Sequence, residues 1–174
     1  DTPDSVFPNN WLSTHQDGTA VLYPMFAENR RLERRPEVLE ELERHGFVIN
    51  NVMDYTSAEE EGFFLEGTGS LLLDRVNKLA YCSISPRADE ELLIEFCEDF
   101  EYLPVIFTAY QSVGDARLPI YHTNVMMALG EEYAVICLDA IDSKAEAKAV
   151  IKQLKSRGKE VINITEKQVE AFAG

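Results

Sequence analysis

Apolar and polar positions along this chain fall into three similar blocks. Each block opens with two apolar runs on either side of a short polar turn, continues with an amphipathic stretch of helical period, and closes with another apolar run. This order predicts two strands, a helix and a third strand in each block. The blocks cover about residues 4–56, 62–111 and 118–165. We therefore predict an α/β fold of three consecutive ββαβ units, followed by the start of a further helix.

The first block carries clear turn and helix signals. Asp17-Gly18 lies between two apolar runs within residues 6–25, and an Asp-Gly pair favours a hairpin. Residues 36–46 begin with a proline, end with a glycine and place apolar side chains on one face, which indicates a helix. Residues 47–53 then form the expected closing strand.

The second and third blocks repeat this order. In the second block the expected segments are strands 63–73 and 79–84, helix 89–100 and strand 103–109. In the third block they are strands 119–129 and 133–138, helix 143–157 and strand 159–164. Ser-x-x-Glu at 143–146 and Thr-x-x-Gln at 165–168 match the capping box, so a helix is expected to begin at each.

A constant step of 56 residues links one polar position in the first expected strand of each block. These positions are Asn10, Glu66 and His122, and each interrupts an apolar run. Equivalent positions of a cyclic repeat lie around one axis. We therefore predict that an amide, a carboxylate and an imidazole converge on one centre. The alternative is that they are separate polar residues at strand ends and that the spacing is coincidental.

The segment Glu66-Gly67-Thr68-Gly69 places a carboxylate beside two glycines in an expected strand. Glycine within a strand often marks the close approach of a ligand or of another backbone. The carboxylate can then pair with an amidine-type cation or accept hydrogen bonds from an amide NH2 group. The alternative is a β-bulge with a solvated glutamate.

His122 is the one histidine within an apolar run. An imidazole can act as general acid and base near neutral pH, although a lone histidine in such a run is more often a hydrogen-bonded core residue. His15 lies next to a turn and His45 at a helix end, so both are expected on the surface. Arg117 is expected as a solvated loop residue, with contact to a substrate carboxylate as the alternative.

Two neighbouring amides, Asn9 and Asn10, precede the only tryptophan of the chain, Trp11. Asparagine commonly caps turns through its side chain. The same two amides can instead direct donors and acceptors into a polar pocket. The sequence leaves both interpretations open.

The composition limits the classes of partner. Apolar residues make up 45% of the 174 residues, which is enough for a globular core. The formal net charge of −15 repels phosphate backbones and anionic lipids, so nucleic acid and acidic membranes are poor partners. We find no apolar run of membrane-spanning length and no signal peptide, and we expect no membrane association.

Cys82, Cys97 and Cys137 lie in expected strands or on an apolar helix face, without the spacing of a zinc site. We expect three reduced core thiols, no bound metal and a cytoplasmic location. The chain opens without an initiator Met and closes on a helix with a C-terminal glycine, so we expect a segment of a longer protein.

Three segments carry a family resemblance: PDSVFPNNW at 3–11, FLEGTGSLLLDR at 64–75 and YHTNVMMALG at 121–130. In this order they resemble the amidinotransferase and deiminase superfamily, which has the pentein fold, and most closely its bacterial citrulline-utilisation hydrolase branch. The resemblance covers essentially the whole chain. It implies a pentein-type α/β propeller of five ββαβ units around a pseudo-fivefold axis. This chain would supply three consecutive units of a single, incomplete catalytic domain.

The resemblance also implies roles for individual residues. Glu66 corresponds to the glutamate that holds the guanidino or ureido nitrogens of the substrate, and His122 to the general acid and base. Asp4 corresponds to an aspartate that faces the substrate's amino group. Asn9-Asn10 replaces a Glu-Asp pair of the dimethylarginine hydrolase branch, whose aspartate also binds the guanidinium. An amide there lacks the negative charge that balances a guanidinium, and it favours a neutral ureido group such as that of citrulline.

The implied reaction is hydrolysis of citrulline to ornithine, ammonia and carbon dioxide through a covalent cysteine intermediate, without a metal or organic cofactor. None of the three cysteines matches the family's nucleophile, which is expected C-terminal to this chain. The expected partner is a small ureido or guanidino amino acid, and homo-oligomerisation stays open. Two alternatives remain: an amidinotransferase, and a non-catalytic pentein that acts as a binding module.

Overall fold

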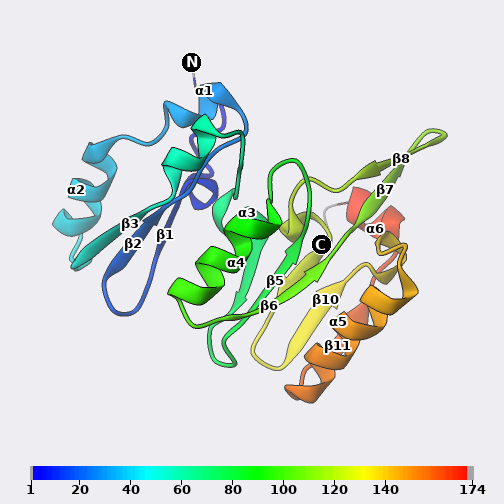
Figure 1. Ribbon diagram of the computed structural model, residues 1–174. Coiled ribbons are helices and arrows are strands. Elements are labelled where there is room, and N and C mark those ends of the chain that lie inside the picture. Colours follow the sequence, from blue (N-terminus) through cyan, green and yellow to red (C-terminus); the bar gives the residue numbers. More distant parts are fainter. Residues whose placement is uncertain (1, 172–174) are drawn as a thin grey trace.

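The computed structural model describes residues 2–171 and contains three ββαβ units (Figure 1). The first unit consists of β1 (Leu12–Thr14), β2 (Thr19–Leu22), α2 (Pro36–Arg44) and β3 (Asn51–Asp54). The second consists of β4 (Leu71–Asp74), β5 (Leu79–Ser83), α4 (Glu90–Asp99) and β6 (Leu103–Phe107). The third consists of β9 (Met127–Leu129), β10 (Tyr133–Ile136), α5 (Lys144–Ser156) and β11 (Glu160–Asn163). The predicted α/β class and the order of elements in each unit are confirmed.

The three sheets share one topology. In each sheet the first strand is antiparallel to the second, and the second is parallel to the third. The strand orders are β1-β2-β3, β4-β5-β6 and β9-β10-β11. A parallel pair needs a crossover connection between its strands, and α2, α4 and α5 provide it.

Side-chain caps fix where the helices begin. Asp89 precedes α4, and its carboxylate accepts from two backbone N–H groups of the first turn. Ser143 caps α5 in the same way, but Glu146 does not return to the cap as a capping box requires. Its carboxylate instead accepts from Thr108 N at 2.7 Å, which joins α5 to the end of β6. The capping box predicted at 165–168 is complete and opens α6 (Glu166–Glu170).

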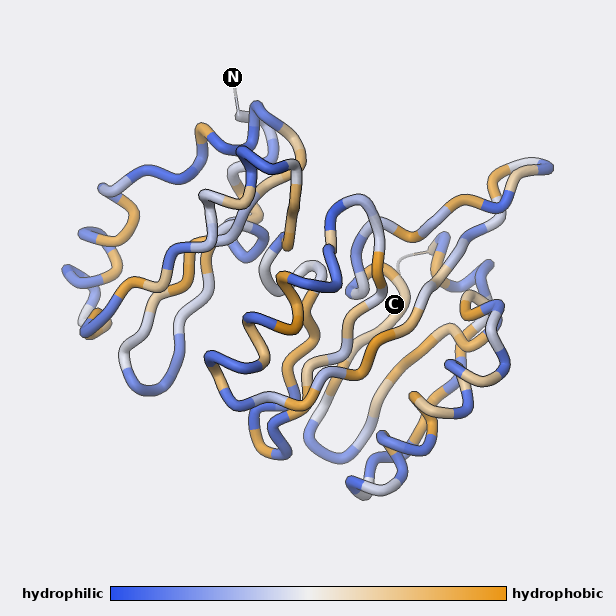
Figure 2. Tube along the Cα trace, viewed as in Figure 1, coloured by the Kyte–Doolittle hydropathy of each residue, from blue (hydrophilic) through white to orange (hydrophobic). Residues whose placement is uncertain are grey.

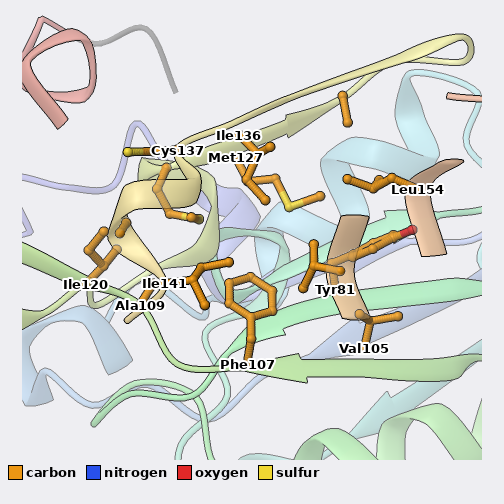
Figure 3. Packing of buried hydrophobic residues seen from close by; sticks show 14 of the residues in the cluster. Tyr81, Val105, Phe107, Ala109, Ile120, Met127, Ile136, Cys137, Ile141 and Leu154 are labelled. Carbon is orange, nitrogen blue, oxygen red and sulfur yellow. The ribbon is translucent and has the colours of Figure 1, made fainter. Parts of the chain in front are cut away.

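Neighbouring units share hydrophobic cores. The core between the second and third units contains side chains from both, including Tyr81, Phe107, Met127, Ile136 and Leu154 (Figure 3). The core that joins the first and second units includes Val21, Tyr23, Leu71, Leu93 and Phe96. Apolar residues run along the strands, and polar residues concentrate on turns and on the outer faces of the helices (Figure 2). These two shared cores therefore hold neighbouring units in fixed relation to each other.

The three polar positions linked by the 56-residue step do not lie in strands. Asn10 ends the turn η1 (Pro8–Asn10), Glu66 directly precedes the turn α3 (Gly67–Ser70), and His122 directly precedes the turn η3 (Thr123–Val125). The strands predicted at 63–73 and 119–129 are therefore wrong in their first halves. Proline at the start of η1 and the positive φ of +42° at Gly67 favour turns over extended pairing.

The closing strand of the first unit is also shorter than predicted. β3 begins at Asn51, whereas the sequence analysis placed the strand at 47–53. Gly46, with a φ of +92°, ends α2, and the exposed side chains of Phe47 and Val48 follow it. Their apolar pattern predicted a strand. The two side chains are not buried, so burial does not stabilise a strand here and none forms.

A two-stranded hairpin between the second and third units was not predicted. It consists of β7 (Tyr110–Val113) and β8 (Ala116–Pro119) and projects away from the other sheets (Figure 1). All of β8 is exposed, so it has no apolar face for a sequence pattern to reveal. Its residue Arg117 forms ion pairs with Asp142, at 2.6 Å, and with Glu166. Arg117 is exposed, as expected, but it lies in a strand and not in a loop, and its ion pairs tie the hairpin to the segments before α5 and in α6.

His15 is not a simple surface residue. Its ring stacks on Phe100, with 4.4 Å between centroids. Burial and, to a smaller extent, the nearby charge of Arg75 lower the pKa of His15 to about 4. His45, at the end of α2, is exposed as predicted.

Short helical turns complete the architecture: α1 (Glu28–Arg31), η2 (Thr56–Glu60) and η4 (Leu138–Ala140). Every helix within residues 2–171 is too short or too polar to cross a lipid bilayer. In the same part of the chain, His, Cys, Asp and Glu side chains form no group that could hold a metal ion.

A buried ion pair joins the second and third units. Asp74, at the end of β4, lies 3.1 Å from the Nζ atom of Lys159, which precedes β11. Both side chains are buried, and Lys159 also donates to the backbone carbonyls of Gly130 and Glu131. Burial alone would raise the pKa of Asp74, but hydrogen bonds from Asn77 and the charge of Lys159 lower it below its usual value.

Removing the cation of this pair is expected to destabilise the chain. The substitution Lys159→Met leaves the Asp74 carboxylate buried without its counter-charge, which costs about 3 kcal/mol in comparable sites. Urea unfolding at pH 7 measures the change in the free energy of unfolding. The control is Lys155→Met, at an exposed position of α5. Equal stability of the two variants would contradict a role for this ion pair.

Candidate active site

Three short helical turns meet at the ends of the sheets. α3 lies between η1 and η3 and is packed closely on η1. A Cβ atom at Gly67 would lie 2.4 Å from the carbonyl oxygen of Asn9. A Cβ atom at Gly69 would lie 2.3 Å from Nδ2 of Asn10 and 3.1 Å from Nδ1 of His122. The two glycines therefore allow the close backbone approach that the sequence predicts, and the side chains of Asn10 and His122 both pack against Gly69.

Glu66 and His122 form a buried hydrogen-bonded pair. Nε2 of His122 donates to Oε2 of Glu66 at 2.6 Å, because an ionised carboxylate only accepts. Glu66 is fully buried and His122 is 6% exposed. This hydrogen bond fixes the proton of a neutral imidazole on Nε2. Nδ1 is then the ring nitrogen that faces Gly69 and Asn10, where it can take up or release a proton.

The carboxylate of Glu66 is held in its ionised form by several donors. Burial alone would raise the pKa of Glu66, but the hydrogen bond and charge of His122 lower it below its usual value. The charge of Arg87 and the N–H of Phe26, which donates to Oε1 at 3.0 Å, act in the same direction. Both carboxylate oxygens therefore contact protein groups, an arrangement that orients the imidazole.

Arg87 contacts Glu66 of this pair and was not identified from the sequence. Its Nη1 atom is 3.4 Å from Oε2 of Glu66, and its guanidinium stacks on the rings of Tyr121 and Phe26 at 4.9 and 6.0 Å. Tyr121 in turn contacts the ring of His122, with 5.0 Å between centroids. The side chain of Arg87 is 31% exposed, so it offers donors to a ligand next to the pair.

The amide of Asn10 has a defined orientation. Its Oδ1 atom accepts from Nη1 of Arg30 at 2.9 Å, and Asn10 is 5% exposed. A guanidinium has donors only, so the oxygen of the amide must face Arg30. The NH2 group consequently faces Gly69 and His122. Arg30 was not identified from the sequence either, because it lies in a run of charged residues and its partner is 20 positions away.

Asn9 and Asp4 are placed less centrally. The backbone carbonyl of Asn9 accepts from the hydroxyl of Thr68 at 3.3 Å, and that of Asp4 accepts from Arg30 at 3.3 Å. Asp4 is exposed. Within residues 2–171, no hydrogen bond joins the side chain of either residue to the Glu66–His122 pair. Their predicted contacts with a substrate therefore stay predictions.

The three cysteines are buried thiols, as predicted. Burial raises the pKa of Cys82 to about 12 and that of Cys97 to about 11. Burial also raises the pKa of Cys137. A nucleophilic cysteine needs a lowered pKa and an exposed sulfur, and these three have neither property.

Comparison with known families assigns the chain. The family model described as N,N-dimethylarginine dimethylhydrolase, eukaryotic, matches residues 1–174. The chain belongs to this family. No curated protein matches the sequence. The dimethylarginine dimethylhydrolase family is part of the amidinotransferase superfamily of pentein proteins, so the superfamily and the pentein-type α/β fold predicted from the three motifs are confirmed.

Solved structures share this fold. Apo ArgZ, an arginine dihydrolase from the ornithine–ammonia cycle in cyanobacteria, has a TM-score of 0.68 and 19% identity, over 98% of this chain and 25% of its own. The product-bound N-terminal domain of ArgZ has a TM-score of 0.69 and 17% identity, over 99% and 57%. A cysteine-to-alanine mutant of AgrE with L-arginine has a TM-score of 0.72 and 20% identity, over 99% and 23%. This chain of the dimethylarginine dimethylhydrolase family thus spans about a quarter of ArgZ and AgrE.

The lowered pKa of Glu66 predicts a specific dependence of stability on pH. A carboxyl group whose pKa is lower in the folded state than its ordinary 4.5 stabilises the fold above pH 4.5, and this contribution is lost as the pH falls through the folded value. Glu66→Gln lacks the contribution at every pH. The free energy of unfolding of the wild type and that of Glu66→Gln should therefore converge below pH 4.5, as measured by urea unfolding.

Glu43→Gln, at an exposed position of α2, is the matched control for this measurement. Its unfolding free energy should stay close to that of the wild type between pH 6.5 and 3.5. A difference between wild type and Glu66→Gln that is constant across this range would show that the charge of Glu66 does not stabilise the fold.

Proposed function

We propose that this chain supplies the acid–base and substrate-orienting part of a hydrolase site for a ureido or guanidino amino acid, with citrulline as the favoured substrate. The observation that carries the proposal is the buried pair of Glu66 and His122, whose Nδ1 atom lies against Gly69 beside the NH2 group of Asn10. Membership of a family of guanidino-group hydrolases supports the same reaction class.

His122 has the surroundings that a general acid and base requires. The carboxylate of Glu66 stabilises the imidazolium that forms when Nδ1 takes up a proton, and it keeps the ring in one orientation. The proton on Nδ1 can then pass to the nitrogen that leaves the substrate. Afterwards the neutral imidazole can remove a proton from water. A fully buried Glu66 strengthens this interaction because little solvent screens it.

The orientation of Asn10 supports a ureido substrate. Its amide NH2 group faces the site, and a ureido carbonyl oxygen accepts from such a donor. A guanidinium carries N–H donors only, so its N–H groups would face the NH2 donor of Asn10 without an acceptor between them. Glu66 is also already paired with the cation of Arg87 and hydrogen-bonded to His122, which leaves no unpaired carboxylate to neutralise a guanidinium.

Arg87 supports recognition of an amino acid rather than a simple urea. It is the partly exposed cation beside the pair, and its guanidinium can take the α-carboxylate of the substrate in a bidentate contact. The rings of Tyr121 and Phe26, on which it stacks, provide apolar surface for the methylene groups of the side chain.

The covalent step requires a cysteine outside these 174 residues, because Cys82, Cys97 and Cys137 are buried with raised pKa values. Its thiolate would attack the ureido carbon, and His122 would protonate the leaving nitrogen. Water activated by His122 would then break the carbon–sulfur bond and release a carbamate, which loses carbon dioxide as its remaining carbon–nitrogen bond breaks and frees the second amine. Citrulline and one water thereby give ornithine, ammonia and carbon dioxide. The inert thiols are also the one observation that favours the alternative of a non-catalytic binding module.

Replacing the proposed acid and base is expected to abolish turnover without abolishing binding. In the full-length protein, His122→Asn should lower kcat for citrulline by roughly 10²–10⁴-fold, the usual contribution of a general acid and base. Calorimetric titration should give a Kd for citrulline within a few-fold of the wild type. His45→Asn, at the exposed end of α2, is the control and should keep full activity. Unchanged kcat in His122→Asn would overturn the assigned role.

A further inference from the structure

Arg30 is a buried cation next to the proposed site. It follows β2 in the helical turn α1 and is 5% exposed. All three nitrogens of its guanidinium donate hydrogen bonds. Nε and Nη2 reach the two oxygens of Glu33 at 3.1 and 3.0 Å, and Nη1 reaches Oδ1 of Asn10 at 2.9 Å. Nη2 also meets the backbone carbonyl of Phe7 at 3.1 Å.

This arrangement leaves the guanidinium little freedom. The two-oxygen contact with Glu33 fixes the plane of the group, and Glu33 itself is 4% exposed. The pair is electrically neutral, so Arg30 adds no net charge to the site. The other hydrogen bonds of Arg30 hold the oxygen of the Asn10 amide and the backbone that precedes η1.

We propose that Arg30 determines substrate specificity by locking the amide of Asn10. With Oδ1 held by Arg30, Nδ2 lies on the side of Gly69 and of Nδ1 of His122. On the proposed function this side meets the substrate, so the amide offers a donor to the central atoms of that substrate. The inference rests on the proposed function and extends it, because it names the residue that selects a ureido carbonyl over a guanidinium. Arg30 touches no substrate in this account and is a positioning residue.

The reverse orientation of the Asn10 amide shows why the hydrogen bond from Arg30 matters. Turned by 180°, Asn10 would present Oδ1 to the site and accept from a guanidinium N–H. Its NH2 group would then face the N–H groups of Arg30, which is a donor-to-donor contact in a buried place and therefore unfavourable. Without Arg30 both orientations become accessible. A bound arginine can then donate to Oδ1 of Asn10, which in the wild type accepts from Arg30 instead.

The test compares citrulline and arginine in the full-length protein. Arg30→Met alone would leave Glu33 as a buried, unpaired charge, so the informative variant is Arg30→Met/Glu33→Met, which replaces the pair by apolar side chains of similar size. The control is Glu33→Gln, which removes the ion pair but keeps the hydrogen bond from Arg30 to Asn10. Both ligands share the α-amino and α-carboxylate groups, so general damage to the site cancels in their ratio.

We expect the ratio of kcat/KM for citrulline to kcat/KM for arginine to fall at least about 10-fold in the double variant. It should not fall in Glu33→Gln, because the charge of Arg30 is no longer balanced there and disfavours the cationic side chain of arginine. Calorimetric titration should show the same fall in the ratio of binding constants for the double variant. An unchanged ratio in a double variant that folds, as judged by circular dichroism, would overturn the inference. A fall in Glu33→Gln as large as that in the double variant would overturn it as well.

The binding measurement separates this inference from the proposed function. A wild type that binds citrulline more tightly than arginine but releases no ornithine would overturn the hydrolase and leave the role of Arg30 to be decided by the binding ratios. A wild type that binds neither ligand would overturn both. If the double variant fails to fold, Asn10→Asp provides a second variant, because it presents an acceptor to the site whatever Arg30 does. Its ratio of binding constants should then fall in the same direction, and an unchanged ratio would overturn the inference.

Discussion

The hydrogen bond between Glu66 and His122 is the interaction on which the rest of the site depends. It places a fully buried carboxylate against an imidazole, and burial of such a charge is costly unless donors surround it. His122, Arg87 and the N–H of Phe26 supply those donors from three different segments. Gly69 completes the constraint, because any side chain there would collide with Asn10 and push His122 away. The short turns before the first strands, rather than the strands themselves, therefore carry the chemistry.

Charge balance runs through the whole site, although the chain has a formal net charge of −15. Glu66 is paired with Arg87 and hydrogen-bonded to His122, and Glu33 is paired with Arg30. On the proposed function, a site built in this way offers a cationic guanidinium no unpaired carboxylate, whereas it offers a ureido carbonyl a fixed amide donor. The proposal therefore rests on local pairing and not on the net charge of the surface.

The sequence predicted the repeat and the convergence of Asn10, Glu66 and His122, because both follow from apolar periodicity and a regular spacing. It did not predict that these residues lie in helical turns, since the positive φ of Gly67 and the packing of α3 on η1 are tertiary properties. The exposed strand β8 has no apolar face, so no apolar pattern in the sequence predicts the hairpin. The roles of Arg30 and Arg87 come from partners about 20 residues or more away, which charge and composition do not reveal.

The most direct test of this account follows the ureido carbon. The full-length protein is incubated with citrulline carrying ¹³C at that carbon, and the label is traced by NMR together with the amount of ornithine formed. The account predicts that the label leaves as carbon dioxide or bicarbonate in equal amount to ornithine. Label that appears on an added amine would show amidino or carbamoyl transfer instead, and label that stays in citrulline would contradict turnover altogether.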